Sequence, residues 1–425
     1  MGVKERLAES MPAGPVRPPL RRRLKEALHL AVSGAGLAVN YLRLKSITAA
    51  FQQRLENALR LSGPGLAGHT PDRLVAAFRD LEQRLLTRWD APLLNDFFTM
   101  IFSGILGRLC ERWGLNRDAP VHQALLCTGG RMISTEPARL ILELARQAAA
   151  DDDLLRILRQ EDTSDLMLRL QGFPEFRLNL RCYLERFGER CTDELKLESA
   201  TLRENPRPLL RAIAALAVSH AGEAGGPGMQ APDRGTMAED GAARVLAALN
   251  SRRRRWVFSW VLKNARERVR TRENLRYERT RVFGRVRTIF LELGRRLHER
   301  GLLEDPRDVF FLEVEEIFAF VQGYAAGTNL KGLVALRRQE YDEYLRQEKP
   351  ADRFETRGIV YHGNRFTGGS GRPSADGDLR RGIGCGPGVA SGRARVVMDP
   401  AAARLEGGEI LVAERTDPGW VILFP

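Results

Sequence analysis

The stretch from Val257 to Leu297 reads VFSWVLKNARERVRTRENLRYERTRVFGRVRTIFLELGRRL. Every third or fourth position traces one face of a helix, which is apolar towards both ends of the stretch. This spacing predicts a single helix of about eleven turns, or roughly 60 Å. Gly301 follows at a position suited to a helix C-terminus. We therefore expect the fold to be organised around one long central helix.

The inward stripe of this helix is not apolar in its middle. Arg268, Arg272 and Arg279 stand where a core helix carries Leu or Val, and Arg276 lies at the edge of the stripe. A buried guanidinium group must find a carboxylate, a phosphate or water. These arginines are the first feature of the chain that requires an explanation.

The charge of the chain is concentrated in the same region. The 425 residues carry a net charge of +13, and residues 251–300 hold 17 Arg and Lys against five Glu. A localised basic element can bind phosphates of any kind. The chain contains no RNP pattern, zinc-finger spacing or helix-turn-helix signature, so a nucleic-acid partner is not favoured.

Length and composition indicate a globular protein of two or three domains. The five cysteines form no CxxC pair, which fits a reducing cytoplasm. The six histidines show no HxxxH spacing, so no metal site is expected. No run of eighteen apolar residues and no signal peptide is apparent, so we expect no membrane partner.

The order of elements predicts a mainly α fold. Residues 1–20 are expected to be a disordered lead, and residues 21–350 a multi-helical domain interrupted by a flexible loop at 221–240. The further helices expected are 21–61, one that begins at Pro71, 91–113, 314–324 and 330–347. Asn95 and Asp96 fall near the start of the third of these, where capping is favoured over a site role.

The charged segment FGERCTDELKLE, residues 187–198, is interpreted as a loop. It is either solvated, or it turns Glu189 and Glu194 towards the arginines of the central helix. An inward salt-bridge network of those arginines with Glu189, Glu194 or Glu273 is the structural alternative to a binding site.

The chain changes character after a Gly-rich and Ser-rich linker at 351–381. Residues 384–388 form a GCGPG turn, and strands are expected at 391–397 and 409–413. The glycines do not complete a GxGxxG motif, because Val389 occupies the last required position. Two strands without a covering helix form an incomplete small α/β domain, so we expect residues 382–425 to be mobile. The apolar side chains expected to be exposed there are Val396, Ile410, Val412 and Trp420.

These motifs resemble those of the phosphoenolpyruvate-utilising phosphotransferases. The segments GCGPGVASGRARVVMDP and EILVAERTDPGWVILF look like the first half of the swivelling phosphohistidine domain of this family. The segments NDFFTMIFSGIL, FGERCTDELKLE with RENP, and RENLRYERTRVFGRVRTIFLELGRRLHERGLLEDP resemble the branch typified by rifampin phosphotransferase. The likeness covers most of the chain from about residue 90 onward.

The resemblance implies that separate domains carry the separate functions of the complete enzyme. In the family, an ATP-grasp domain supplies the phosphoryl group, with ATP and Mg as cofactors, and a carrier histidine follows the Thr-Asp-Pro-Gly-Trp turn. Nothing in this chain resembles the ATP-grasp domain, and the expected position of that histidine lies beyond Pro425. No catalytic residue is therefore carried over, and we expect the isolated chain to bind no cofactor. The missing domains would be partners in cis or in trans.

In this family the arginines would hold the transferring phosphoryl group, because fixed cations stabilise its oxygens. The candidate phosphate-binding residues are Arg268, Arg272, Arg276 and Arg279. The residues expected to orient them are Glu189, Arg190, Glu194 and Glu273. The favoured hypothesis is a phosphotransferase fragment that binds a small-molecule acceptor. The alternatives are a non-catalytic module that binds a small ligand and, less favoured, a nucleic-acid binder that uses residues 252–287.

Overall fold

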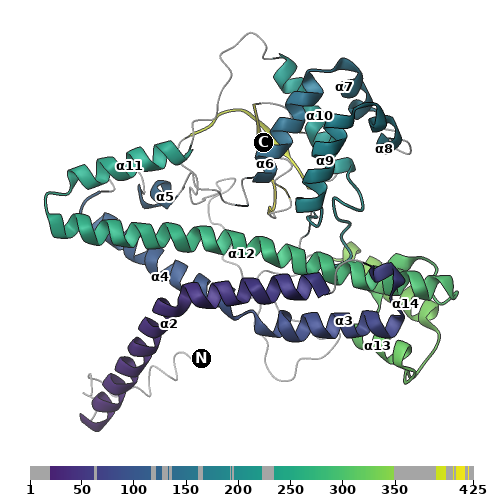
Figure 1. Cartoon of the computed structure of the whole chain (residues 1–425), viewed down its shortest axis with the longest axis horizontal. Coiled ribbons are helices and arrows are strands. Elements are labelled where there is room, and N and C mark those ends of the chain that lie inside the picture. Colours follow the sequence, from purple (N-terminus) through teal and green to yellow (C-terminus); the bar gives the residue numbers. More distant parts are fainter. Residues whose placement is uncertain are drawn as a thin grey trace.

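The computed structural model describes residues 20–61, 65–115, 121–126, 133, 136–160, 166–191, 193, 196–222, 234–348, 389–398, 405, 408–416 and 420. In these residues the fold is mainly α, as the sequence predicted (Figure 1). The helices of four or more residues are α2 (Leu20–Leu61), α3 (Pro71–Arg84), α4 (Asp90–Arg112), α5 (Val121–Leu126), α6 (Glu136–Ala149), α7 (Asp152–Arg159), α8 (Leu166–Arg169), α9 (Pro174–Phe187), α10 (Arg207–Gly222), α11 (Arg234–Ala248), α12 (Arg252–Glu299), η4 (Pro306–Phe311), α13 (Val314–Gln322) and α14 (Leu330–Arg346).

Helix α12 is the central element and runs for 48 residues, from Arg252 to Glu299. Its capping residue is Arg300, and Gly301 then adopts a left-handed conformation with φ of 73°. Glycine reaches this conformation at little cost, which explains why the helix ends there. The expected boundaries of the central helix are confirmed, with one additional turn at its N-terminus.

Three apolar clusters meet along α12. The first contains Leu275 to Leu297 of α12 with α3, η4, α13, α14 and the C-terminal half of α2. The second joins α6 to α10 and touches α12 through Tyr277, and Figure 1 shows these helices above α12. The third contains Phe258 to Ala265 of α12 with α4, α5 and α11. The long helix is therefore shared by otherwise separate cores, and the stretch between Ala265 and Leu275 separates two of them.

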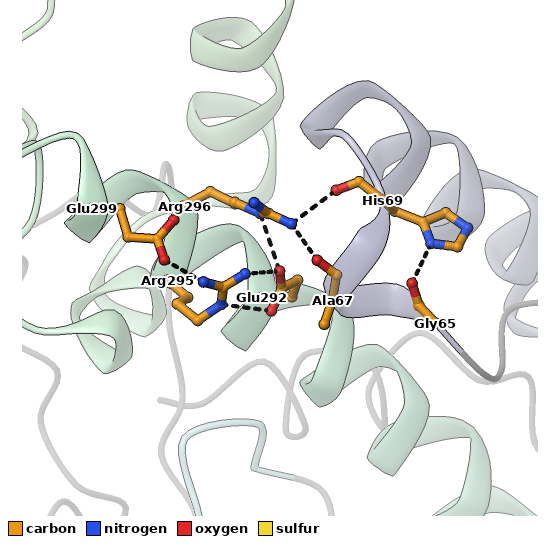
Figure 2. Close-up of polar contacts among 7 residues, drawn as sticks. All are labelled: Gly65, Ala67, His69, Glu292, Arg295, Arg296 and Glu299. Carbon is orange, nitrogen blue, oxygen red and sulfur yellow. Dashed lines mark hydrogen bonds and ion pairs between the residues drawn. The ribbon is translucent and has the colours of Figure 1, made fainter.

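The last turns of α12 are tied to the connection between α2 and α3 (Figure 2). Arg296 donates to the carbonyl oxygens of Ala67 and His69, and its Nε lies 3.1 Å from Glu292 Oε1. Glu292 also accepts two hydrogen bonds from Arg295, of 3.0 and 2.6 Å. One half-buried carboxylate thus fixes two arginines, and one of them holds the neighbouring loop.

The described C-terminal residues include two short strands. Strand β1 (Arg393–Val396) pairs in parallel with β2 (Glu409–Val412), with Arg393 opposite Glu409. Both strands agree with the sequence prediction, although each is shorter than expected. Val396 is 65% exposed and Val412 is 43% exposed, as expected. Ile410 is also partly exposed, at 37%. Trp420 is buried, with only 7% of the residue exposed, so the prediction of an exposed Trp420 is wrong.

Three predicted non-helical segments require comment. The loop predicted at 221–240 is wrong at both ends, because α10 continues to Gly222 and α11 begins at Arg234. The Ala-rich sequence on either side favours helix, and residues 223–233, between the two helices, lie outside the described residues. The predicted lead at 1–20, apart from Leu20, and the predicted linker at 351–381 lie outside the described residues.

One described stretch, Pro71–Arg112, has the length and composition of a membrane span. In the structure this stretch is divided between α3 and α4, which are joined by a short 3-10 helix at Leu86–Arg88. Buried side chains of α3 and α4 contribute to two of the three apolar clusters.

Candidate functional site

The candidate site lies where α4 packs against the middle of α12. Asn95 is fully buried, and its Nδ2 donates to the carbonyl oxygen of Arg268 at 3.0 Å. Asp96, the next residue, lies 3.4 Å from Nε of Arg272. Both side chains stand in the interior of α4, which begins at Asp90, so the capping interpretation is wrong. The sequence NDFFTM instead places one amide and one carboxylate opposite the arginines of α12.

Arg268 is buried, as its position in the inward stripe predicted. Only 4% of the residue is exposed, and its Nη2 lies 2.8 Å from Oε1 of Glu267. Glu267 also lies 3.6 Å from Nζ of Lys45 on α2. In the described part of the chain, the buried Nε of Arg268 and the buried Oδ1 of Asn95 have no hydrogen-bond partner. A polar layer therefore separates the two apolar clusters that adjoin it along α12.

The other three candidate arginines are more accessible. The side chain of Arg272 is 51% exposed, and that of Arg276 is 42% exposed and lies 3.9 Å from Glu273. Arg279 is half-buried, and its buried Nε has no hydrogen-bond partner among the described residues. Along α12 the row is therefore buried at Arg268, exposed at Arg272 and Arg276, and half-buried again at Arg279.

The residues expected to orient these arginines are placed differently. Glu189 pairs with Arg203 at 3.3 Å and packs against Gly284, well along α12 from Arg272. Arg190 is buried with its guanidinium group 5.7 Å from the ring centroid of Tyr277. Glu194 lies outside the described residues. Of the predicted orienting carboxylates, Glu273 is the one within ion-pair distance of a candidate arginine, Arg276.

A second polar contact along α12 was not anticipated from the sequence. Arg281 donates to both carboxylate oxygens of Glu56 on α2, at 2.6 and 3.2 Å, and to Glu278 at 2.7 Å. The hydrogen bond from Arg281 lowers the pKa of Glu56, whereas burial raises the pKa of Glu278. No sequence pattern pairs positions 56 and 281, because their proximity depends on how α2 crosses α12.

We expect the contact between Glu56 and Arg281 to make stability depend on pH. A carboxyl group whose pKa is lower in the folded state stabilises the fold above its unfolded pKa of about 4.3, and this contribution is lost as pH falls through the folded pKa. Glu56→Gln should lower the free energy of unfolding near pH 7 by less than about 1 kcal/mol, because the pair is partly solvated. The difference from wild type should shrink as pH falls below about 4.3 and vanish once the pH lies below the lowered folded pKa of Glu56. Urea unfolding across this pH range measures it, with Glu185→Gln on an exposed face of α9 as the control.

Arg287 is the most deeply buried arginine of α12, at 1% exposure, and it too was missed. Its Nε donates to the Leu197 carbonyl at 2.9 Å, and its Nη2 donates to the Lys196 carbonyl at 2.8 Å. Nη2 also lies 3.4 Å from Sγ of Cys191. This arginine holds the charged loop after α9 through main-chain oxygens, which residue types in the sequence do not reveal.

The arrangement favours binding of an anion at Arg272 and Arg276, the two accessible arginines in the middle of the row. Arg272 and Arg276 each have one carboxylate neighbour at 3.4 Å or more, so their guanidinium groups retain free donors. Among the described residues, no group of three His, Cys, Asp or Glu side chains is placed to hold a metal ion. The site therefore offers cationic donors of fixed position and no described ligand set for a metal.

Comparisons with known proteins cover this region. Residues 94–273, from Leu94 of α4 to Glu273 of α12, match the family described as rifampicin phosphotransferase fourth domain. Over 97% of its length, the chain is 26% identical to the rifampicin phosphotransferase of Streptomyces sviceus. Over 64% of its length, it is 24% identical to that of Bacillus subtilis. An uncharacterized protein of Mycobacterium tuberculosis is 26% identical over 97% of the chain. The chain spans 46%, 31% and 43% of these relatives, so it corresponds to less than half of each.

Proposed function

We propose that this chain, which is related to the phosphoenolpyruvate-utilising phosphotransferases, binds the small-molecule acceptor of a phosphoryl transfer. In the complete enzyme, the phosphoryl group would pass from ATP, with Mg²⁺, to a histidine of a carrier domain and then to the acceptor. The helical region supplies acceptor binding, and the segment with β1 and β2 supplies part of the carrier domain. The ATP-grasp domain and the rest of the carrier domain act as partners, in the same or another polypeptide, and the enzyme works in the cytoplasm.

The observation that carries this proposal is the row of arginines at the end of the segment that matches the family, with Arg268 and Arg272 inside residues 94–273 and Arg276 just beyond them. Arg268 is buried beside Asn95, while Arg272 and Arg276 reach the surface one and two turns further along α12. A transferring phosphoryl group develops charge on its oxygens, and positioned guanidinium donors stabilise that charge. Asp96 would hold Arg272 in a defined orientation, which reduces the cost of ordering the side chain on binding.

Rifampicin is the first acceptor to test, because two of the relatives carry its name. We expect the purified chain to bind rifampicin, measured by quenching of tryptophan fluorescence. Arg272→Ala should weaken binding by about tenfold, since hydrogen bonds to charged groups contribute about 1.5–3 kcal/mol. Arg270→Ala is the matched control, because Arg270 lies on the same helix with an exposed side chain and should leave binding unchanged.

Two outcomes would contradict the proposal in different ways. Equal affinity of wild type and Arg272→Ala for rifampicin would show that the arginine row does not contribute to acceptor binding. Release of AMP from ATP by the purified chain, in the presence of rifampicin, would contradict the proposal that the ATP-grasp domain is a separate partner. Binding that depends on Arg272 but gives no product with a phosphohistidine donor domain would favour the non-catalytic binding module.

A further inference from the structure

The N-terminal third of α12 carries an exposed stripe of basic and aromatic side chains, outside the row of candidate arginines. We define the basic-aromatic stripe by five residues that follow one another along a single face of the helix: Arg252, Arg253, Trp256, Trp260 and Lys263. All five are exposed, with Trp256 at 69% and Trp260 at 42%. The three- and four-residue spacing aligns these side chains on one helix face.

The stripe is bounded by packed elements on both sides. Tyr41 of α2 contacts the Trp260 ring, with centroids 6.2 Å apart, and its hydroxyl donates to Asn264 at 2.7 Å. On the other side, Nε of Arg266 donates to the carbonyl of Leu125 in α5 at 2.8 Å. The helix is therefore held rigidly below an accessible face, which is a suitable base for a binding surface.

The positive charge of the stripe is not neutralised within the described part of the chain. Arg252, Arg253 and Lys263 have no ion pair there, whereas Arg281 and Arg295 further along α12 each pair with two carboxylates. The first turn of α12 also has no acidic residue. Arginines at a helix N-terminus add to the positive end of the helix dipole, so their placement is unfavourable unless an anion binds.

The aromatic members of the stripe differ from the other tryptophans of the chain. Trp256 has no ring partner among the described residues, whereas Trp89 packs on Phe51 and Trp113 packs on Phe258. Trp260 contacts Phe102 at 5.4 Å but remains 42% exposed. Two tryptophans one turn apart, flanked by unpaired cations, present apolar ring area and positive charge together.

We propose that the basic-aromatic stripe binds single-stranded nucleic acid. Arg252, Arg253 and Lys263 would contact phosphates, and Trp256 and Trp260 would stack on unpaired bases. The sequence showed no recognised nucleic-acid motif, so the proposal rests on the exposed side chains and their alignment. A second copy of this chain is disfavoured because each copy carries a charge of +13.

The test is fluorescence anisotropy of the full chain with a labelled oligothymidylate of about 20 nucleotides, a length chosen to exceed the site size of typical single-strand binders. We expect binding at low salt that weakens steeply as salt rises. Trp256→Ala should reduce affinity by about tenfold, because stacking on one aromatic ring contributes about 1–3 kcal/mol per base. The double variant Arg253→Gln with Lys263→Gln should lower the slope of log affinity against log salt by about 1.4, or about 0.7 for each contact.

The matched controls are Tyr344→Ala and Arg346→Ala, which remove an exposed aromatic ring and a basic side chain from α14. These variants should bind the oligonucleotide as the wild type does. The same measurement is made with three other ligands, which distinguishes the possible ligands of the stripe. These are a duplex of equal length, thymidine monophosphate and vesicles containing phosphatidylserine. Absence of oligonucleotide binding, binding unchanged by Trp256→Ala, or preference for the duplex or the vesicles would each overturn the proposal. Each variant's circular dichroism spectrum verifies that the helices remain folded.

Discussion

Gly294→Ala should destabilise the junction between α12 and η4 by about 2–3 kcal/mol, the range expected when a well-packed interior is overfilled. A Cβ atom at this position would lie 2.0 Å from the carbonyl oxygen of Pro306 and 3.1 Å from Cβ of Val309. The nearest obstacle is backbone of η4, so it cannot move aside as a flexible side chain would. The helix propensity of alanine offsets this by only about 1 kcal/mol.

The matched control is Gly104→Ala, which makes the same change in the interior of α4. A Cβ atom at Gly104 would meet nothing within 4 Å, so this variant should be neutral or stabilised by up to about 1 kcal/mol. Urea unfolding followed by far-UV circular dichroism compares the two variants with wild type. A loss for Gly294→Ala no larger than that for Gly104→Ala would show that η4 does not approach α12 this closely.

The central helix could be predicted because its signal is local. Apolar side chains recur from Val257 to Leu297 with one period, and Gly301 supplies the stop, so no knowledge of distant segments is needed. The predicted loop between α10 and α11 was too long at both ends for the opposite reason. The Gly and Pro residues at 222–232 led to a loop prediction for the whole segment 221–240, although the flanking Ala-rich turns favour helix.

The partners of the arginines could not be predicted, because they come from other helices. The inward position of Arg268 follows from helical periodicity, and the structure places it in the interior. The identities of Asp96 beside Arg272 and Glu56 beside Arg281 depend on how α4 and α2 cross α12. The predicted partner Glu189 instead lies on Gly284, where the absent side chain makes room for it. Residue type alone gives no such distances.

Exposure of the basic-aromatic stripe was not predicted, although it follows from the period of the central helix. Trp256 and Trp260 have the spacing of core residues, and tryptophan is highly buried on average. The neighbouring residues Phe258, Val261 and Leu262 occupy the buried face in their place. This buried face continues the inward stripe through Val261 and Arg268, and Trp256 and Trp260 lie outside it.

Arg287→Met should lower the free energy of unfolding by about 2–4 kcal/mol, because it leaves two main-chain acceptors without their donor. Each buried acceptor that loses its hydrogen bond costs about 1–3 kcal/mol. The carbonyls of Lys196 and Leu197 accept from Nη2 and Nε of Arg287 at 2.8 and 2.9 Å, and the arginine is only 1% exposed. Methionine fills a similar volume but donates no hydrogen bond. Arg287→Lys should be nearly as damaging, since a single ammonium group lacks the planar fork that reaches both carbonyls.

The loop after α9 should respond before the rest of the molecule. The amides of Leu202 and Arg203 donate to the carbonyls of Arg190 and Gly188 at 2.8 and 2.9 Å, which closes this loop on itself. In Arg287→Met, hydrogen exchange at these two amides should accelerate while the amides of α3 remain protected, because the loop opens locally. Arg300→Met, at the exposed C-terminal cap of α12, is the control and should change neither stability nor exchange. Ordinary surface substitutions change the free energy of unfolding by no more than about 0.5 kcal/mol. If the free energy of unfolding of Arg287→Met lies that close to the wild-type value, the loop is held by its own hydrogen bonds and not by α12.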